Sequence, residues 1–167
     1  MRWEDVDLSE GTWTLPAEAT KAGRSHVVPL APLTIEILKG LPRKTIIAAH
    51  VVRPSPYVFT TAGGVPVAGF SKAKPRLDQT IARAGGGTAL DPWTIHDLRR
   101  TAATGMARLG VSRFNIGKIL NHADRSVTGI YDRHAYLTEK REALDKWAAY
   151  LKSLAAAPED NVVALRA

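Results

Sequence analysis

The sequence predicts an α+β domain that is mainly helical and carries a small three-stranded antiparallel sheet near its N-terminus. Two patterns support this fold class. Short runs of β-branched and aromatic residues between turn signals dominate the first 60 residues, which is typical of hairpins. Apolar residues at helical spacing dominate the remainder. The 167 residues, 45% of them hydrophobic, suffice for one domain with a buried core.

Three strands are expected in the first 60 residues. Thr12–Leu15 follows a turn signal and is rich in residues that favour strands. His26–Leu30 returns after a polar connection, so Lys21 should lie near a hairpin tip. Tyr57–Thr60 is the expected third strand, whereas residues 42–56, with three prolines, are expected to form a loop.

The helices are expected to start and stop at recognisable signals. Thr94 is a good N-cap, and Asp97 three positions later completes an acidic variant of the capping box. The expected helical segments are Pro32–Leu41, Phe70–Ala84, Thr94 to about Leu109, a helix capped by Ser112, a short helix at Ser126–Tyr131 and a long one from Thr138. Residues 1–157 should form the domain, with 158–167 as a flexible tail.

Positive charge is concentrated in two parts of the chain. The net charge is +7 overall, yet residues 1–20 carry −4, while residues 21–76 carry +8 and residues 96–141 carry +5. Clustered positive charge favours a polyanionic partner such as nucleic acid, although a basic surface kept for solubility remains an alternative. No apolar run is long enough to span a bilayer, so no membrane partner is expected. The absence of cysteine excludes disulfides and thiolate metal sites and suits a cytoplasmic location.

The most informative residues lie between His96 and Tyr131. His96 and Arg99 are three residues apart near a helix N-terminus, where they share a face and where backbone N–H groups favour anions. A guanidinium can hold two phosphate oxygens, and an imidazole can donate to phosphate or move a proton. His122 follows in a polar turn, and Tyr131 comes nine residues later with a phenol that can act as a nucleophile once deprotonated.

Together these motifs resemble the phage integrase, or tyrosine recombinase, family. The resemblance is carried by His96-Asp97-Leu98-Arg99, by Leu120-Asn121-His122 and by Tyr131 at its spacing. It also covers residues 21–30, which look like that family's lysine-bearing hairpin leading into a Val-Pro-Leu strand, and residues 2–8. The matched positions therefore extend from about residue 2 to about residue 150.

The resemblance implies a role for each matched residue. Tyr131 would attack the scissile phosphate of double-stranded DNA and form a 3′-phosphotyrosine, while Lys21 would protonate the departing 5′-oxygen. Arg99 would neutralise the non-bridging oxygens, and His96 and His122 would bind the phosphate or handle the proton of the nucleophile. Neither metal nor any other cofactor is required. Basic residues expected to contact DNA are Arg24, Arg100, Lys72, Lys74 and Arg125.

One member of the expected site is missing from the sequence. The family's first catalytic arginine should precede Asp5 by about eleven residues, a position before Met1, and Arg2 has the wrong spacing to replace it. The sequence therefore resembles an N-terminally truncated catalytic domain. Two functions stay open: an enzyme of DNA recombination and integration, or a catalytically impaired DNA-binding remnant of an integrase.

Other interpretations are weaker. The histidines His96, His122 and His134 have no acidic partner at metal-binding spacing, and Gly85-Gly86-Gly87 lacks the Gly-Lys-Ser/Thr of a phosphate loop. The apolar stripe of the last helix, with Leu144, Trp147 and Leu151, fits packing within its own domain slightly better than self-association with a second copy on DNA.

Overall fold

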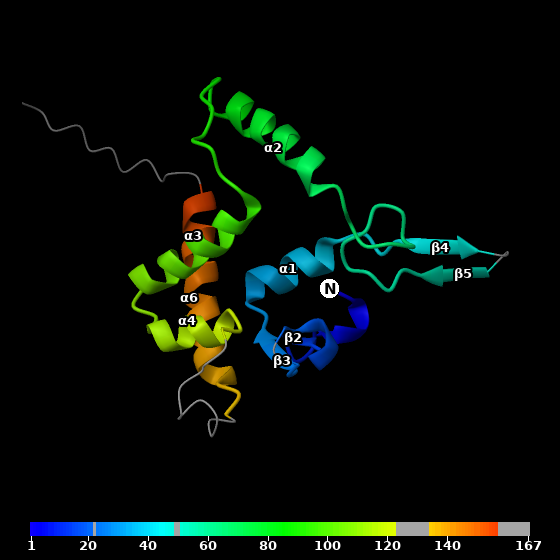
Figure 1. Ribbon diagram of the computed structural model, residues 1–167, viewed down its shortest axis with the longest axis horizontal. Coiled ribbons are helices and arrows are strands. Elements are labelled where there is room, and N and C mark those ends of the chain that lie inside the picture. The colour runs from blue at the N-terminus through cyan, green and yellow to red at the C-terminus, as the bar shows by residue number, and fades with distance from the viewer. Residues whose placement is uncertain (22, 49–50, 123–133, 157–167) are drawn as a thin grey trace, which may run out of the picture.

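A computed structural model describes residues 1–21, 23–48, 51–122 and 134–156. A sheet part and a helical part lie against each other, while one hairpin and one helix project from them (Figure 1). The elements in chain order are η1 (Trp3–Asp5), β1 (Val6–Asp7), β2 (Thr12–Leu15), η2 (Ala17–Ala19), β3 (His26–Pro29), α1 (Pro32–Gly40), β4 (Thr45–Ala48), β5 (Val51–Pro54), α2 (Phe70–Ala84), α3 (Ile95–Arg108), α4 (Arg113–Ile119) and α6 (Leu137–Ala155).

The three-stranded sheet has the order β1-β2-β3, and both pairings are antiparallel. Trp13 of β2 pairs with Val6 on one side and with Val28 on the other. The prediction of a small antiparallel sheet near the N-terminus is therefore confirmed. The identity of its third strand was wrong, because β1 takes the place expected for Tyr57–Thr60.

Residues 57–60 lie beside the N-terminus without forming a regular strand. Tyr57 makes one isolated antiparallel bridge, to Arg2. The buried Ser55 hydroxyl accepts a hydrogen bond from the Tyr57 backbone N–H at 3.1 Å and donates to the Gly63 carbonyl at 2.7 Å. Such local bonds between a serine side chain and the backbone compete with a strand ladder, which explains the difference from the prediction.

The predicted loop at residues 42–56 contains a second, two-stranded sheet. β4 and β5 pair antiparallel, with Ile47 opposite Val52. The prolines that suggested a loop lie at or beyond the ends of the hairpin, where a missing backbone N–H does not interrupt the pairing. The hairpin projects from the body (Figure 1), and Ile47 remains 75% exposed.

The described helices agree with their predicted segments to within about two residues. α3 begins after Thr94 with the expected capping box, and Ser112 caps α4 by accepting a hydrogen bond from the Asn115 backbone N–H at 3.1 Å. The last helix starts at Leu137, one residue earlier than expected. The predicted short helix at residues 126–131 and the tail at 158–167 lie outside the described residues. No helix within the described ranges has both the length and the apolar content needed to cross a membrane.

Two hydrophobic clusters form the core, and α6 connects them. One cluster joins α3, α4 and α6 around Met106, which is 1% exposed. The other packs Leu30, Leu38 and Val58 beneath the sheet. Because α6 contacts β3 and α1 as well as α3 and α4, it fixes the sheet part against the helical part.

The close contact between α3 and α6 depends on Gly105. A Cβ atom at this position would lie 2.7 Å from Cη2 of Trp147, so the indole would have to move. We expect Gly105→Ala to lower the free energy of unfolding by about 1–3 kcal/mol, because overpacking outweighs the gain in helix propensity. Gly117→Ala in α4 is the matched control: nothing lies within 4 Å of its Cβ, and a gain of about 0.5–1 kcal/mol is expected. Urea denaturation of both variants measures the difference, and equal effects would contradict the packing argument.

Candidate active site

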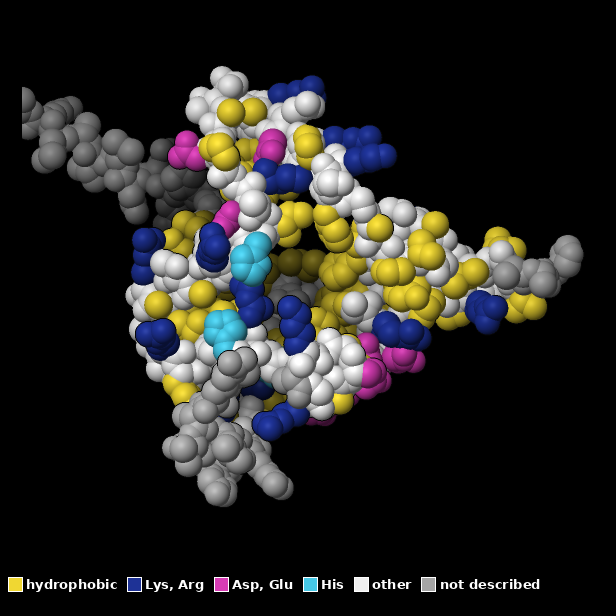
Figure 2. Space-filling view, viewed as in Figure 1, with side chains coloured by type: hydrophobic (Ala, Val, Ile, Leu, Met, Phe, Trp, Pro, Cys, Tyr) yellow, Lys and Arg dark blue, Asp and Glu magenta, His cyan; other side chains and the backbone are white. Residues whose placement is uncertain are grey.

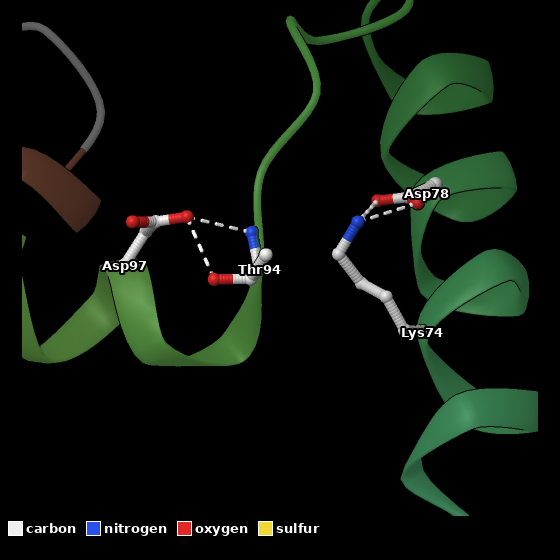
Figure 3. Close-up of polar contacts among 4 residues, drawn as sticks. All are labelled: Lys74, Asp78, Thr94 and Asp97. Carbon is white, nitrogen blue, oxygen red and sulfur yellow. Dashed lines mark hydrogen bonds and ion pairs between the residues drawn. The ribbon is translucent and has the colours of Figure 1, made fainter.

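The first turn of α3 is held by hydrogen bonds between Thr94 and Asp97. The backbone N–H and the hydroxyl of Thr94 both donate to Oδ2 of Asp97 at 2.8 Å (Figure 3). These bonds, the backbone bond first, lower the pKa of Asp97 below its ordinary 3.8 and keep the carboxylate charged. His96 and Arg99, both exposed, belong to the helical turns that this cap starts.

Arg99 reaches from α3 to the end of α4. Its Nη2 donates to the Leu120 carbonyl at 2.6 Å, while the side chain stays exposed. Only one of the five N–H donors of a guanidinium is needed for this bond, which leaves others for an anion. The Arg99 side chain therefore contacts the backbone of α4 at Leu120, two residues before His122 in the chain.

His122 is placed by the backbone at the end of α4. Asn121 has φ 53°, and the His122 backbone N–H donates to the Gly117 carbonyl at 2.9 Å. This six-residue closure with a left-handed residue is a Schellman ending, and asparagine tolerates the left-handed conformation better than most residues. The imidazole of His122 is exposed just beyond the helix.

Lys21 lies in the connection between β2 and β3, as predicted, and is exposed. This connection is closed by Thr20, whose hydroxyl bonds to the Arg24 carbonyl at 2.8 Å and accepts from the Arg24 backbone N–H at 3.1 Å. Gly23 adopts φ 61°, which a glycine accepts without strain. The lysine is therefore carried by a closed turn with its own hydrogen bonds.

Two side chains that the sequence interpretation had not singled out tie β3 to the helical part. The His26 ring lies with Nε2 3.2 Å from the Ile119 carbonyl at the end of α4. Lys140 of α6 is 3% exposed and donates to the Val27 carbonyl at 2.5 Å. Lys140 could have been suspected from its position four residues before Leu144 on the apolar stripe, whereas nothing in the sequence pointed to the partner of His26.

The titration of His26 should make stability depend on pH. Burial, and to a lesser extent the charge of Lys140, lower the pKa of His26 below 6.5, so the unfolded chain binds its proton first as pH falls. The stabilisation is complete above pH 6.5 and is lost as pH falls through the lowered pKa. For this single proton the free energy of unfolding should fall by at most about 1.4 kcal/mol per pH unit. Urea denaturation from about pH 5 to pH 7.5 checks this, and an identical dependence in His26→Gln would contradict it.

The predicted DNA-contacting residues differ in how available their charges are. Arg24 and Lys72 are exposed. Lys74 pairs with Asp78 at 2.7 Å (Figure 3) and lies over the Trp93 ring, and Arg100 pairs with Asp97 at 2.9 Å. Arg125 lies outside the described residues. On one face of the helical part, Lys and Arg side chains gather beside histidines (Figure 2).

The end of α4 thus brings Arg99 and His122 together and is connected to the strand that follows the Lys21 hairpin. Arg99 bonds to Leu120, His122 lies two residues further on, and His26, in the strand after the Lys21 hairpin, bonds to Ile119. His96 lies one turn before Arg99 on α3. Tyr131 lies outside the described residues. Within the described ranges, no group of three His, Asp or Glu side chains is arranged to hold a metal ion.

Comparisons with known proteins agree on one family. The model of the phage integrase family matches residues 1–138. The chain is 28% identical over 158 residues to prophage integrase IntZ of Escherichia coli K12, which covers 93% of the chain and 35% of that relative. It is 30% identical over 134 residues to tyrosine recombinase XerA of Pyrococcus furiosus, which covers 80% of the chain and 43% of that relative. The chain therefore spans less than half the length of these relatives. No solved structure matches it.

Proposed function

The chain belongs to the phage integrase family, and from this premise we propose that it is the catalytic domain of an enzyme that cuts and rejoins double-stranded DNA. The observation that supports this most directly is that Arg99 and His122 lie at the end of α4, which His26 also connects to the strand that follows the Lys21 hairpin. One segment of α4 would then align cationic and proton-transferring groups along a single phosphate.

In the proposed reaction the Tyr131 hydroxyl loses its proton and attacks the scissile phosphorus. A phosphotyrosine forms at the 3′ side, the bond to the 5′-oxygen breaks, and Lys21 supplies the proton that this oxygen takes up. Arg99 stabilises the charge that builds on the non-bridging oxygens, and His96 and His122 bind the phosphate or accept the phenol proton. Religation is the reverse, because the covalent intermediate retains the energy of the broken bond.

The described residues on either side of Tyr131 support its participation. On one side, His122 follows the C-terminus of α4. On the other side, the His134 ring packs against Tyr136, whose ring in turn contacts Phe114 of α4. Described residues before and after the segment that contains Tyr131 therefore lie beside α4.

A catalytically impaired DNA-binding remnant is the second candidate. Arg2, the arginine nearest to the position where the family has its first catalytic arginine, pairs with Glu4 at 2.5 Å and lies 5.8 Å from the centre of the Tyr57 ring. Its side chain is therefore engaged by Glu4 and Tyr57. Without a further arginine the transition state would lose several kcal/mol of stabilisation.

The proposal extends to self-association on DNA through α6. A groove of about 800 Å³ lies between α3 and α6, and apolar side chains including Leu98, Leu109 and Trp147 line it. The other faces of α6 pack within the domain, against β3, α1 and α4. Leu154, at the C-terminal end of the groove, is 63% exposed and suits contact with a second copy.

Trapping of covalent complexes tests the two functions against each other. The chain is incubated with a pool of random-sequence duplexes carrying a nick, so that a short 5′-hydroxyl strand dissociates after cleavage and the adduct accumulates. An adduct that resists detergent, with recovered DNA of shared sequence, supports the enzyme. No adduct, together with binding that weakens steeply between about 50 and 200 mM salt, supports the remnant. If neither an adduct nor salt-sensitive binding is observed, both proposed functions are contradicted.

A further inference from the structure

The end of α4 accepts hydrogen bonds from two separate elements. The Ile119 carbonyl lies 3.2 Å from Nε2 of His26 in β3, and the Leu120 carbonyl accepts from Arg99 of α3 at 2.6 Å. These atoms belong to the last turn of the helix, where carbonyls lack partners within the helix itself. Side chains from β3 and α3 therefore both donate hydrogen bonds to carbonyls at the C-terminal end of α4, and this fixes both elements relative to that helix end.

His26 lies where the Lys21 hairpin leaves the sheet. It forms the last pair of the β2–β3 ladder, opposite Leu15, and nearer the tip the two sides of the connection are joined by the hydrogen bonds between Thr20 and Arg24. A bond from His26 to α4 therefore acts at the base of the turn, five residues from Lys21. Ile119 is 9% exposed, so its carbonyl has little access to water as a replacement partner.

We propose that His26 is a positioning residue for the cleavage reaction: by donating its Nε2–H to the Ile119 carbonyl, it sets the Lys21 hairpin at the correct place relative to Arg99 and His122. The inference rests on the proposed function and gives His26 no contact with DNA. Lys140 supports the same strand from α6 through the Val27 carbonyl, so β3 is held at two adjacent residues.

The chemistry of the leaving group separates positioning of Lys21 from a general loss of structure. A 5′-oxygen leaves poorly unless Lys21 protonates it, whereas a sulfur in its place leaves as a thiolate and needs no proton. If His26 positions Lys21, its loss must slow cleavage of the oxygen substrate far more than cleavage of the sulfur substrate. A variant that is merely unstable slows both equally.

The test compares adduct formation on the DNA sequence recovered from the nicked pool, made with a 5′-oxygen or a 5′-bridging sulfur at the scissile phosphate. For His26→Leu we expect a loss of about 10- to 100-fold on the oxygen substrate and little loss on the sulfur substrate, as general acids contribute about 10²- to 10⁴-fold. His26→Gln, which keeps an N–H at the same reach, should recover most of the rate. Val58→Ala, in the cluster beneath the sheet, controls for lost stability and should affect both substrates equally. Equal losses on both substrates for His26→Leu would overturn the proposal.

Hydrogen exchange gives a readout that does not require activity. In His26→Leu, exchange of the Gly23 and Arg24 amides, which donate to Thr20, should become at least several-fold faster than in wild type and in His26→Gln. Unchanged exchange would show that the hydrogen bond from His26 to Ile119 does not hold the hairpin. If wild type forms no adduct, the proposed enzymatic function fails, while exchange still decides whether His26 holds the hairpin.

Discussion

Replacing Tyr131 with phenylalanine is expected to reduce covalent attachment to DNA to the background level while binding at low salt persists. Phenylalanine keeps the ring and removes the one oxygen that can bond to phosphorus, so no intermediate can form. The measurement is the detergent-resistant adduct on nicked DNA, followed by mass-spectrometric identification of the peptide that carries the nucleotide. We expect this peptide to contain Tyr131.

Tyr150→Phe is the matched control for this variant. Tyr150 is 40% exposed on α6 and packs against Trp147, so removal of its hydroxyl leaves the ring contact in place. The control should form the adduct at the wild-type rate. An adduct that persists in Tyr131→Phe, or that maps to another residue, would disprove the nucleophile assigned here.

Arg99→Ala carries the second largest expected effect, a loss of about 10³-fold in the rate of adduct formation. The guanidinium can face two phosphate oxygens at the end of α4, because the Leu120 bond uses one donor and the residue is exposed. Arg99→Lys should recover little, since a single ammonium cannot hold Leu120 and a phosphate fork together. Single-turnover adduct formation measures both variants.

Arg100→Ala provides the comparison for Arg99. The two residues are adjacent on α3 and exposed, but Arg100 pairs with Asp97 instead of reaching α4. We expect Arg100→Ala to weaken DNA binding only a few-fold, with a slightly smaller salt dependence, and to leave the rate of the bound complex almost unchanged. Thermal unfolding of both variants controls for the lost Leu120 bond. Equal rate losses in the two variants would contradict a specific role for Arg99.

The sequence was sufficient for the helix boundaries, which depend on capping residues close by in the chain. The caps at Thr94 and Ser112 were predicted because their hydrogen bonds lie within three residues. The hairpin at β4–β5 was missed because its prolines fall at its ends, and the third strand was misplaced because Ser55 diverts the backbone. Residue types and spacing were likewise enough to suggest Arg99 and His122 as candidates.

The residues that connect these candidates were not predictable. His26 and Ile119 are 93 residues apart, and Lys140 and Val27 are 113 apart. In each pair one partner is a backbone carbonyl, which carries no signature in the amino-acid sequence. Only the packing of α4 and α6 against β3 determines which carbonyl meets which side chain.

The ending of α4 has an electrostatic consequence for the proposed site. Aligned peptide dipoles give the C-terminus of a helix a partial negative charge, up to about half an electron, which repels an approaching phosphate. Arg99 and His26 place N–H groups on the carbonyls that carry this charge. Arg99 thus both offers donors to the anion and screens the unfavourable field of the helix, and this double effect is a physical reason for an arginine at this position.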